Sequence, residues 1–331
     1  MASYENLQFT HRHSIFCILP PHILRNIVEH GNDAQRRIAS LGLAVDNTLR
    51  AMRAAAPRRA EAPTAKRPGL FAEEGAKQRT IYDAKNTQNL PGALVRSEGS
   101  GPSSDVAVNE AYDGLGDTLN LYWDVYGRNS IDDEGMRLDA TVHFVQDYGN
   151  AFWNGERMVF GDGDGQLFNR FTISLDIIGH ELAHGVTEDE AGLIYFYQAG
   201  ALNESLSDVF GSLVKLYRLK QTAAQADWLI GAGLLTSNVK GVALRSMKAP
   251  GAAFNDPVLG KDPQPAHMRD FVRTFEDNGG VHINSGIPNH AFYQASTLIG
   301  GNAWEKAGKS GMRPCGTTGC APTPASSVLP S

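Results

Sequence analysis

Cysteine is scarce in this chain of 331 residues, which contains only Cys17, Cys315 and Cys320. Three cysteines are too few for a disulfide-stapled scaffold. The chain also lacks an excess of basic residues, because 30 Lys and Arg face 36 Asp and Glu for a formal charge of −6. A nucleic-acid surface needs a clustered basic excess, and no apolar run approaches the roughly 20 residues that span a bilayer. We therefore expect neither nucleic acid nor a membrane as a partner.

Both ends of the sequence lack familiar features. Residues 1–20 contain no apolar run long enough for the core of a signal peptide and no small-residue cleavage site after one, so we expect no standard leader. Residues 310–331 are mostly Gly, Pro, Ser and Thr with two cysteines, and they show little periodicity. We expect an atypical, low-complexity tail, in which Cys315 and Cys320 form a small loop disulfide or stay unpaired.

The most informative segment is His180-Glu181-Leu182-Ala183-His184. On a helix, residues four apart share a face, so both imidazoles can reach one metal ion while Glu181 points beside it toward a bound water. This is the minimal equipment of a zinc peptidase, and such a site needs a third protein ligand. An ordinary amphipathic helix with surface histidines is the alternative reading of this motif alone.

Glu204 lies twenty residues after His184 in a second stretch of helical character, and we predict it as the third ligand. Asp208 follows one turn later, where it can accept a hydrogen bond from the non-ligating nitrogen of a zinc histidine. A solvated helix face is the alternative. It does not easily explain acids at i and i+4 within an apolar run formed by Ala201, Leu202, Leu206, Val209 and Phe210.

Four further blocks extend the pattern: NAFWNG at 150–155, GDGDG at 161–165, AGLIY at 191–195 and DNGGVHINSG at 277–286. With the histidine motif and the Glu204 block, they make the chain resemble the thermolysin-like neutral metalloproteases, the M4 peptidase family, from about residue 86 to about residue 309. The resemblance implies a zinc endopeptidase that acts on proteins or peptides. It also implies an α+β fold with a β-rich N-terminal lobe, an α-helical C-terminal lobe and the zinc helix between them.

The residue patterns agree with this architecture. Alternating runs at 141–145 and 157–160 predict strands, a helical insertion is expected at 106–117, and helical patterns dominate from 171 onward. With 42% hydrophobic residues, the chain can form two folded domains and a tail. We predict four units: a propeptide and basic linker at 1–70, the β-rich lobe with the zinc helix at 71–185, the helical lobe at 186–309, and the tail at 310–331.

The propeptide prediction comes from a helical pattern at 15–52, broken at Gly31, followed by a linker of Ala, Pro, Arg and Lys at 54–68. This arrangement, with Pro20-Pro21, resembles the short propeptide of the protealysin-like subgroup. We expect the segment to occupy the cleft as an intramolecular inhibitor and to be cut between about Ala62 and Gln78. An accessory dimerisation or binding module is the alternative. Cys17 is expected to be either a thiolate ligand of zinc or, more simply, a small buried hydrophobe.

The resemblance also assigns chemical roles. Zinc held by the two histidines and Glu204 makes a water molecule nucleophilic near neutral pH. Glu181 is the general base, Tyr195 and His282 donate hydrogen bonds to the oxyanion, and Asp277 orients His282.

Substrate binding follows from the same resemblance. Asn150 and Ala151 on an edge strand would pair with an extended peptide, and Arg245 would bind the carbonyl of the residue just after the cleaved bond. Leu244 and Ile177 would line a pocket that favours a bulky apolar residue there. Simple core packing is the alternative for these two residues.

Two departures from the family pattern stand out. Lys215 replaces a calcium-ligating acid while its companion Asp176 is retained, so we expect an ammonium in place of a double calcium site and only a weak case for calcium. The tail replaces several further family helices, which suggests a truncated or frameshifted end. A catalytically inactive relative acting as a binding protein is therefore the alternative function. Secretion is the family expectation, with cytoplasmic retention or leaderless export as the alternatives.

Overall fold

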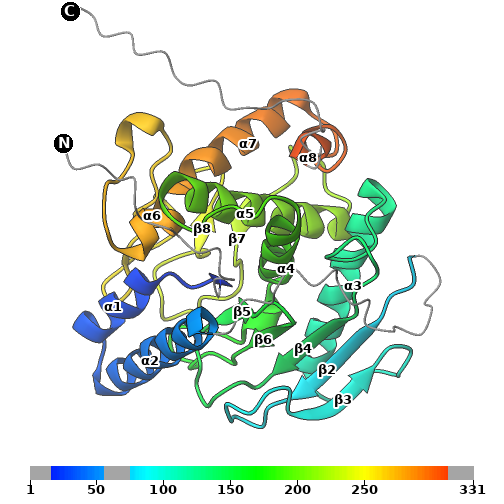
Figure 1. Cartoon of the computed structure of the whole chain (residues 1–331). Helices are drawn as coiled ribbons and strands as arrows, with labels where there is room; N and C mark the ends of the chain where they lie inside the picture. The colour runs from blue at the N-terminus through cyan, green and yellow to red at the C-terminus, as the bar shows by residue number, and fades with distance from the viewer. Residues whose placement is uncertain (1–15, 56–74, 312–331) are drawn as a thin grey trace, which may run out of the picture.

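The computed structural model describes residues 16–55 and 75–311. A six-stranded mixed sheet lies in one half of the molecule and a group of helices in the other (Figure 1). The strand order is β1-β5-β6-β4-β2-β3. Residues 1–15, 56–74 and 312–331 lie outside the described residues. They include the start of the predicted propeptide, most of its predicted linker, and nearly all of the predicted tail with Cys315 and Cys320.

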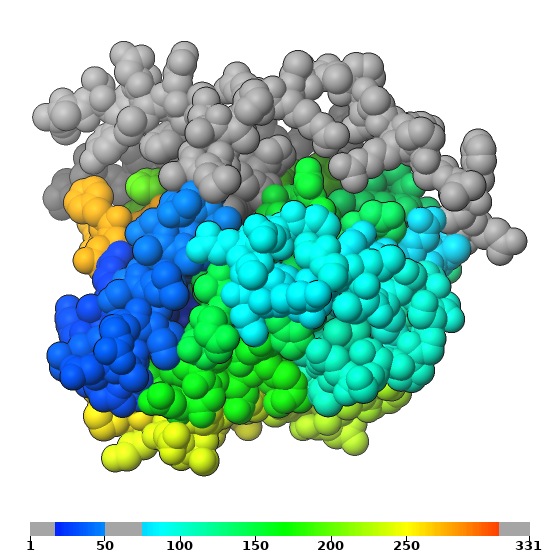
Figure 2. Space-filling model, turned by 90° about the horizontal axis from the view of Figure 1, so that it is seen from below, coloured from blue at the N-terminus to red at the C-terminus, as the bar shows by residue number. Residues whose placement is uncertain are grey.

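The N-terminal unit consists of β1 (Phe16–Cys17) and the helices α1 (Pro21–His30) and α2 (Asp33–Ala55). Pro21 starts α1, where its missing amide hydrogen removes no helical bond. Asn32 begins α2, because its Oδ1 accepts from the amides of Ala34 and Gln35, each at 3.0 Å. This helical pair with its break at Gly31 agrees with the sequence pattern. Figure 2 shows the unit, in blue, lying directly against the green part of the chain.

The sheet half contains β2 (Arg79–Asp83), β3 (Ala93–Ser97), β4 (Leu138–Val142), β5 (Ala151–Trp153) and β6 (Arg157–Phe160). β4 pairs parallel with β2 and β6, whereas β5 runs antiparallel to β6 and to β1. α3 (Val106–Tyr126) packs on the sheet, capped by the Asp105 side chain at its start and by left-handed Gly127 at its end. The expected insertion begins at the predicted residue and extends nine residues further, to Tyr126.

The helical half contains α4 (Leu175–Glu190), α5 (Tyr197–Leu219), α6 (Asp277–Asn284), α7 (Gly286–Ile299) and α8 (Lys306–Gly311). Its irregular parts include the short helices η1 (Phe171–Ile173) and η2 (Met268–Asp270) and two small ladders. The ladders pair β7 (Leu229–Ile230) with β8 (Arg245–Ser246), and β9 (Asn255–Asp256) with β10 (Gly260–Lys261). The predicted α+β arrangement is confirmed, whereas the predicted unit boundaries stay predictions. Within the described segments, no helix is both long and apolar enough to span a membrane.

α4 is the central helix, and every residue from Asp176 to Thr187 is buried. It packs unusually closely against α5 because glycines face each other at the crossing. A Cβ on Gly211 would lie 2.3 Å from the backbone oxygen of Asp176, and one on Gly179 would lie 3.0 Å from Cα of Gly211. Only glycine allows this approach, which brings the polar faces of the two helices together.

Gly211→Ala therefore tests the crossing. The added methyl group must separate α4 from α5, and we expect the free energy of unfolding to fall by about 1–3 kcal/mol. Urea denaturation followed by circular dichroism measures the change. Gly101→Ala is the matched control, because a Cβ on Gly101 meets nothing within 4 Å. Equal stability of the two variants would contradict the close-packing account.

Candidate metal centre

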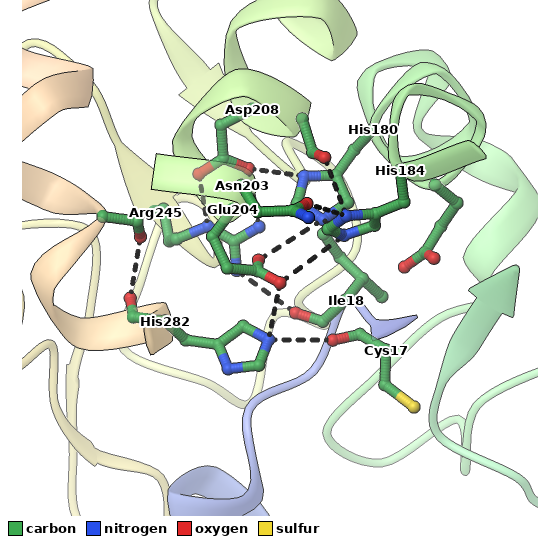
Figure 3. Close-up of polar contacts among 12 residues, drawn as sticks. Cys17, Ile18, His180, His184, Asn203, Glu204, Asp208, Arg245 and His282 are labelled. Carbon is green, nitrogen blue, oxygen red and sulfur yellow. Dashed lines mark hydrogen bonds and ion pairs between the residues drawn. The ribbon is translucent and has the colours of Figure 1, made fainter. Parts of the chain in front are cut away.

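α4 and α5 bring together His180, His184 and Glu204, all fully buried (Figure 3). The two Nε2 atoms lie 3.0 Å apart, His180 Nε2 lies 3.6 Å from Glu204 Oε2, and His184 Nε2 lies 3.5 Å from Glu204 Oε1. Ligand atoms bound to one tetrahedral zinc ion lie roughly 3.3 Å from one another. The three side chains therefore have the spacing of a metal site, as the sequence predicts.

Hydrogen bonds on the far side of each imidazole set its tautomer. Asp208 Oδ1 accepts from His180 Nδ1 at 2.8 Å, and Asn203 Oδ1 accepts from His184 Nδ1 at 2.7 Å. With the proton on Nδ1, each Nε2 carries a lone pair directed at the other and at the Glu204 carboxylate. Three lone-pair donors converging in a buried space fit a bound cation.

Asn203 was not predicted from the sequence, nor was Ser207, whose Oγ lies 2.9 Å from His184 Nδ1. A signal for both existed. Asn203 directly precedes Glu204, and Ser207 follows Asn203 by one helical turn. Polar residues that flank a candidate ligand on its own helix are the natural partners of the other ligands' free nitrogens.

Asp208 connects this cluster to the rest of the molecule. Besides His180, it accepts from Arg245 through Nε at 2.9 Å and Nη2 at 2.7 Å, and from Asn289 Nδ2 at 2.8 Å. Burial alone would raise the pKa of Asp208, but Arg245 and His180 outweigh it and lower that pKa. Asp208 is therefore a carboxylate fixed between the candidate ligand and a guanidinium.

Glu181 lies on the sheet side of α4, where its Oε2 accepts from the Trp153 amide at 3.0 Å. Burial and the nearby Glu204 carboxylate raise the pKa of Glu181 well above its usual value. On the opposite side, Tyr195 contacts Glu204 through its hydroxyl group, which also lies 3.3 Å from His282 Nε2.

His282 is oriented by Asp277, whose Oδ1 lies 2.6 Å from His282 Nδ1 and whose Oδ2 accepts from the His282 amide at 2.9 Å. Burial lowers the pKa of His282, but Asp277 and Glu204 outweigh it, and the pKa is raised overall. The residues predicted for catalysis thus meet around one point, although their roles stay predictions.

The comparisons with known proteins agree with this geometry. The family model of the thermolysin metallopeptidase catalytic domain matches residues 64–188, and the model of its alpha-helical domain matches residues 191–312. The chain belongs to the thermolysin-like M4 metallopeptidases. Membership identifies it as a metalloendopeptidase.

Similar M4 proteins cover most of this chain. An extracellular metalloprotease of Pectobacterium carotovorum subsp. carotovorum is 55% identical over 295 residues, which are 89% of this chain and 82% of that protein. The solved precursor of protealysin, a metalloproteinase from Serratia proteamaculans, is 56% identical with a TM-score of 0.80, covering 89% of this chain and 84% of that one. Thermolysin of Alicyclobacillus acidocaldarius subsp. acidocaldarius is 42% identical over 65% of this chain and 37% of its own length.

The residues predicted to bind substrate in this M4 enzyme lie on several elements. Ala151 begins β5, Asn150 directly precedes it, Arg245 is on β8, and all three are buried. Ile177 and Leu244 are fully buried in one apolar cluster, which also includes Ile18 of the N-terminal unit. This position is compatible with both predicted roles of these two residues, which are to line a substrate pocket or to pack in the core.

The predicted pairing of the Lys215 ammonium with Asp176 is observed. Lys215 Nζ lies 2.8 Å from Asp176 Oδ2 and 2.9 Å from Asp227 Oδ1, and it donates to the Leu229 carbonyl at 2.6 Å. Burial lowers the pKa of Lys215, but the two carboxylates outweigh it and raise that pKa. The low expectation for calcium stays a prediction.

Lys215→Met tests how much the ion pair between Lys215 and Asp176 contributes to stability. The substitution leaves the buried Asp176 carboxylate without its cation, so we expect a loss of about 3–5 kcal/mol in the free energy of unfolding. Denaturant titration measures it. Arg218→Met is the control, because the 63% exposed Arg218 side chain pairs with Asp117 at the surface and should contribute less than about 1 kcal/mol. A loss in Lys215→Met no larger than in the control would show that the pair is dispensable.

Proposed function

We propose that this M4 metallopeptidase is a zinc-dependent endopeptidase made as a self-processing zymogen, with residues 1–70 as its propeptide. One observation carries the proposal: β1 adds antiparallel to the edge strand β5, and its neighbours contact the predicted catalytic and substrate-binding residues. An extended segment pairing with a sheet edge is the expected binding mode of a peptide substrate. The N-terminal unit thus lies where a substrate would bind.

The catalytic roles follow from the positions of the side chains. His180, His184 and Glu204 would hold zinc, which would polarise a peptide carbonyl and activate water. Glu181 takes a proton from the attacking water and passes it to the departing amine. Tyr195 and His282 donate to the developing oxyanion, and Asp277 keeps the His282 ring oriented for that purpose.

Preference for a bulky apolar residue just after the cleaved bond is part of the proposal. Ile18 is fully buried in the same cluster as Ile177 and Leu244, and its carbonyl accepts from Arg245 Nη1 at 3.1 Å. An apolar side chain with its carbonyl on Arg245 is what the predicted pocket should accept. Each methylene in such a pocket contributes about 1–3 kcal/mol to discrimination.

Cys17 fits the role of a small buried hydrophobe better than that of a zinc ligand. Its side chain belongs to an apolar cluster with Val45, Phe144 and Phe152. Its sulfur points away from His180, His184 and Glu204 (Figure 3). We therefore propose inhibition by occupation of the cleft rather than by a cysteine on the metal.

Secretion is proposed because similar proteins from Pectobacterium and Serratia are named extracellular metalloproteases. A catalytically inactive binding protein is the weaker candidate. The chain retains every predicted metal ligand and the predicted base Glu181.

Intact mass over time, with added zinc, tests the zymogen. We expect the chain to lose its N-terminal segment by a cut between about residue 62 and residue 78, within the predicted linker. Glu181→Ala, which removes the base, should stay whole while still binding one zinc ion. Processing of both proteins would assign the cut to a contaminating protease, and zinc binding without processing of the wild type would refute self-activation.

Docking of the propeptide should depend on pH through His22. Both ring nitrogens of His22 are buried without a hydrogen-bond partner among the described residues. The charged groups that face it are Asp277, His282, Arg245 and Arg25, the last paired with Glu276. Burial lowers the pKa of His22 from 6.5 to about 4, opposed only by Asp277. Because the docked pKa lies below the free one, docking is most favourable above pH 6.5 and weakens as the pH falls toward 4.

The two pKa values imply about a thirty-fold weaker docking equilibrium at about pH 5 than at about pH 7.5. Undocking of the propeptide should speed hydrogen exchange of the α1 amides, which can be measured in the uncleavable Glu181→Ala chain. In the same background, His22→Leu should abolish the difference between the two pH values. An equal acid effect in both proteins would show that His22 is not its source.

A further inference from the structure

Four hydrogen bonds fix residues 17–19, which comprise the end of β1 and the two residues after it. The Cys17 carbonyl lies 3.1 Å from His282 Nε2, and the Ile18 amide donates to the Ala151 carbonyl at 3.2 Å. The Ile18 carbonyl accepts from Arg245 Nη1 at 3.1 Å, and the Leu19 amide donates to Asn150 Oδ1 at 3.0 Å. The partners come from α6, from β5 with its preceding residue, and from β8, so three elements hold the register. Figure 3 shows the contacts with His282 and Arg245.

These contacts follow the order expected for a substrate, if the roles under the proposed function hold. His282 is the donor to the carbonyl under attack, and it lies at the Cys17 carbonyl. Arg245 binds the carbonyl of the next residue, and it lies at the Ile18 carbonyl. The peptide bond between these two carbonyls is Cys17–Ile18.

Glu181 contacts the same strand that binds this segment. Its Oε2 accepts from the amide of Trp153 in β5 at 3.0 Å, and the carbonyl of Ala151 in β5 accepts from the Ile18 amide at 3.2 Å. Peptide hydrolysis must deliver a proton to the departing nitrogen, and here that nitrogen is the Ile18 amide. The acceptor of the water proton and its destination thus both contact β5.

We propose that Cys17–Ile18 is a self-cleavage site inside the inhibitory segment, distinct from the linker cut that removes the propeptide. Water adds to the Cys17 carbonyl carbon and the C–N bond breaks. Cys17 keeps the new carboxylate, and Ile18 becomes a free amine after receiving the proton through Glu181. Only water is consumed. The inference rests on the proposed function, because the cut uses the same zinc-dependent endopeptidase activity.

The fragment that begins at Ile18 should stay docked after the cut. Asn26 Nδ2 donates to the Leu259 carbonyl at 2.8 Å, and Arg25 pairs with Glu276 at 2.6 Å. Asp46 on α2 is buried, where it accepts from the Tyr148 hydroxyl at 2.5 Å and from Asn150 Nδ2 at 3.1 Å. None of these contacts depends on the residues before Ile18. The cut therefore creates a two-chain inhibited form rather than an active enzyme.

Mass spectrometry of the full-length chain, quenched with acid at intervals after zinc addition, tests the proposal. We expect a peptide ending at Cys17 and a partner beginning Ile18-Leu19-Pro20. The first-order rate constant of their formation should be independent of protein concentration, because the bond is cut within its own molecule. Glu181→Ala should yield neither. Ile18→Leu should keep the cut, whereas Ile18→Gly should slow it about tenfold or more by emptying the apolar pocket.

The outcomes separate this inference from the proposed function. Linker processing without any cut at Cys17–Ile18 would overturn the inference and leave the zymogen intact. A cut whose apparent first-order rate constant rises with protein concentration would also overturn it, because one molecule would then be cutting another. A zinc-loaded chain that cuts neither bond and hydrolyses no added protein would overturn both.

Discussion

The approach of α4 to α5 is the constraint on which the rest of the site depends. Two imidazoles and a carboxylate can share one ion only if their helices cross closely enough, and Gly211 removes the side chain that would prevent it. The crossing also fixes the outer partners of the imidazoles, because Asn203 and Asp208 lie on the same helix as Glu204. One backbone contact in the core thus sets both the ligands and the hydrogen bonds that orient them.

Asp208 and Arg245 connect this core to the cleft. The carboxylate faces the His180 imidazole on one side and the guanidinium on the other, and the guanidinium reaches the Ile18 carbonyl. Arg245, which donates to the Ile18 carbonyl, is therefore held by the same carboxylate that orients the candidate ligand His180. Two buried charges thus connect the segment around Ile18 to the candidate metal site.

The sequence predicted the features that depend on local periodicity. Spacing on one helix face identified His180 and His184, and an acid in a second helical stretch identified Glu204. Resemblance supplied Tyr195 and His282 from distant segments. Features created by long-range packing escaped prediction. Asp46 reads as an ordinary polar residue of a helix, and only the folded chain places it against residues about a hundred positions away. The end of α3 was missed because its last turns, including the buried Tyr122, are held by tertiary contacts rather than by an evident repeat.

The substrate-like register of the segment after β1 has an evolutionary consequence. Under the proposed function, the donors that contact Cys17 and Ile18 also bind the substrate, so a change in substrate preference also changes the inhibition. Ile18 belongs to the same buried apolar cluster as the proposed pocket residues Ile177 and Leu244. On the proposed roles, a new substrate specificity therefore requires paired substitutions, one in the cleft and one at Ile18.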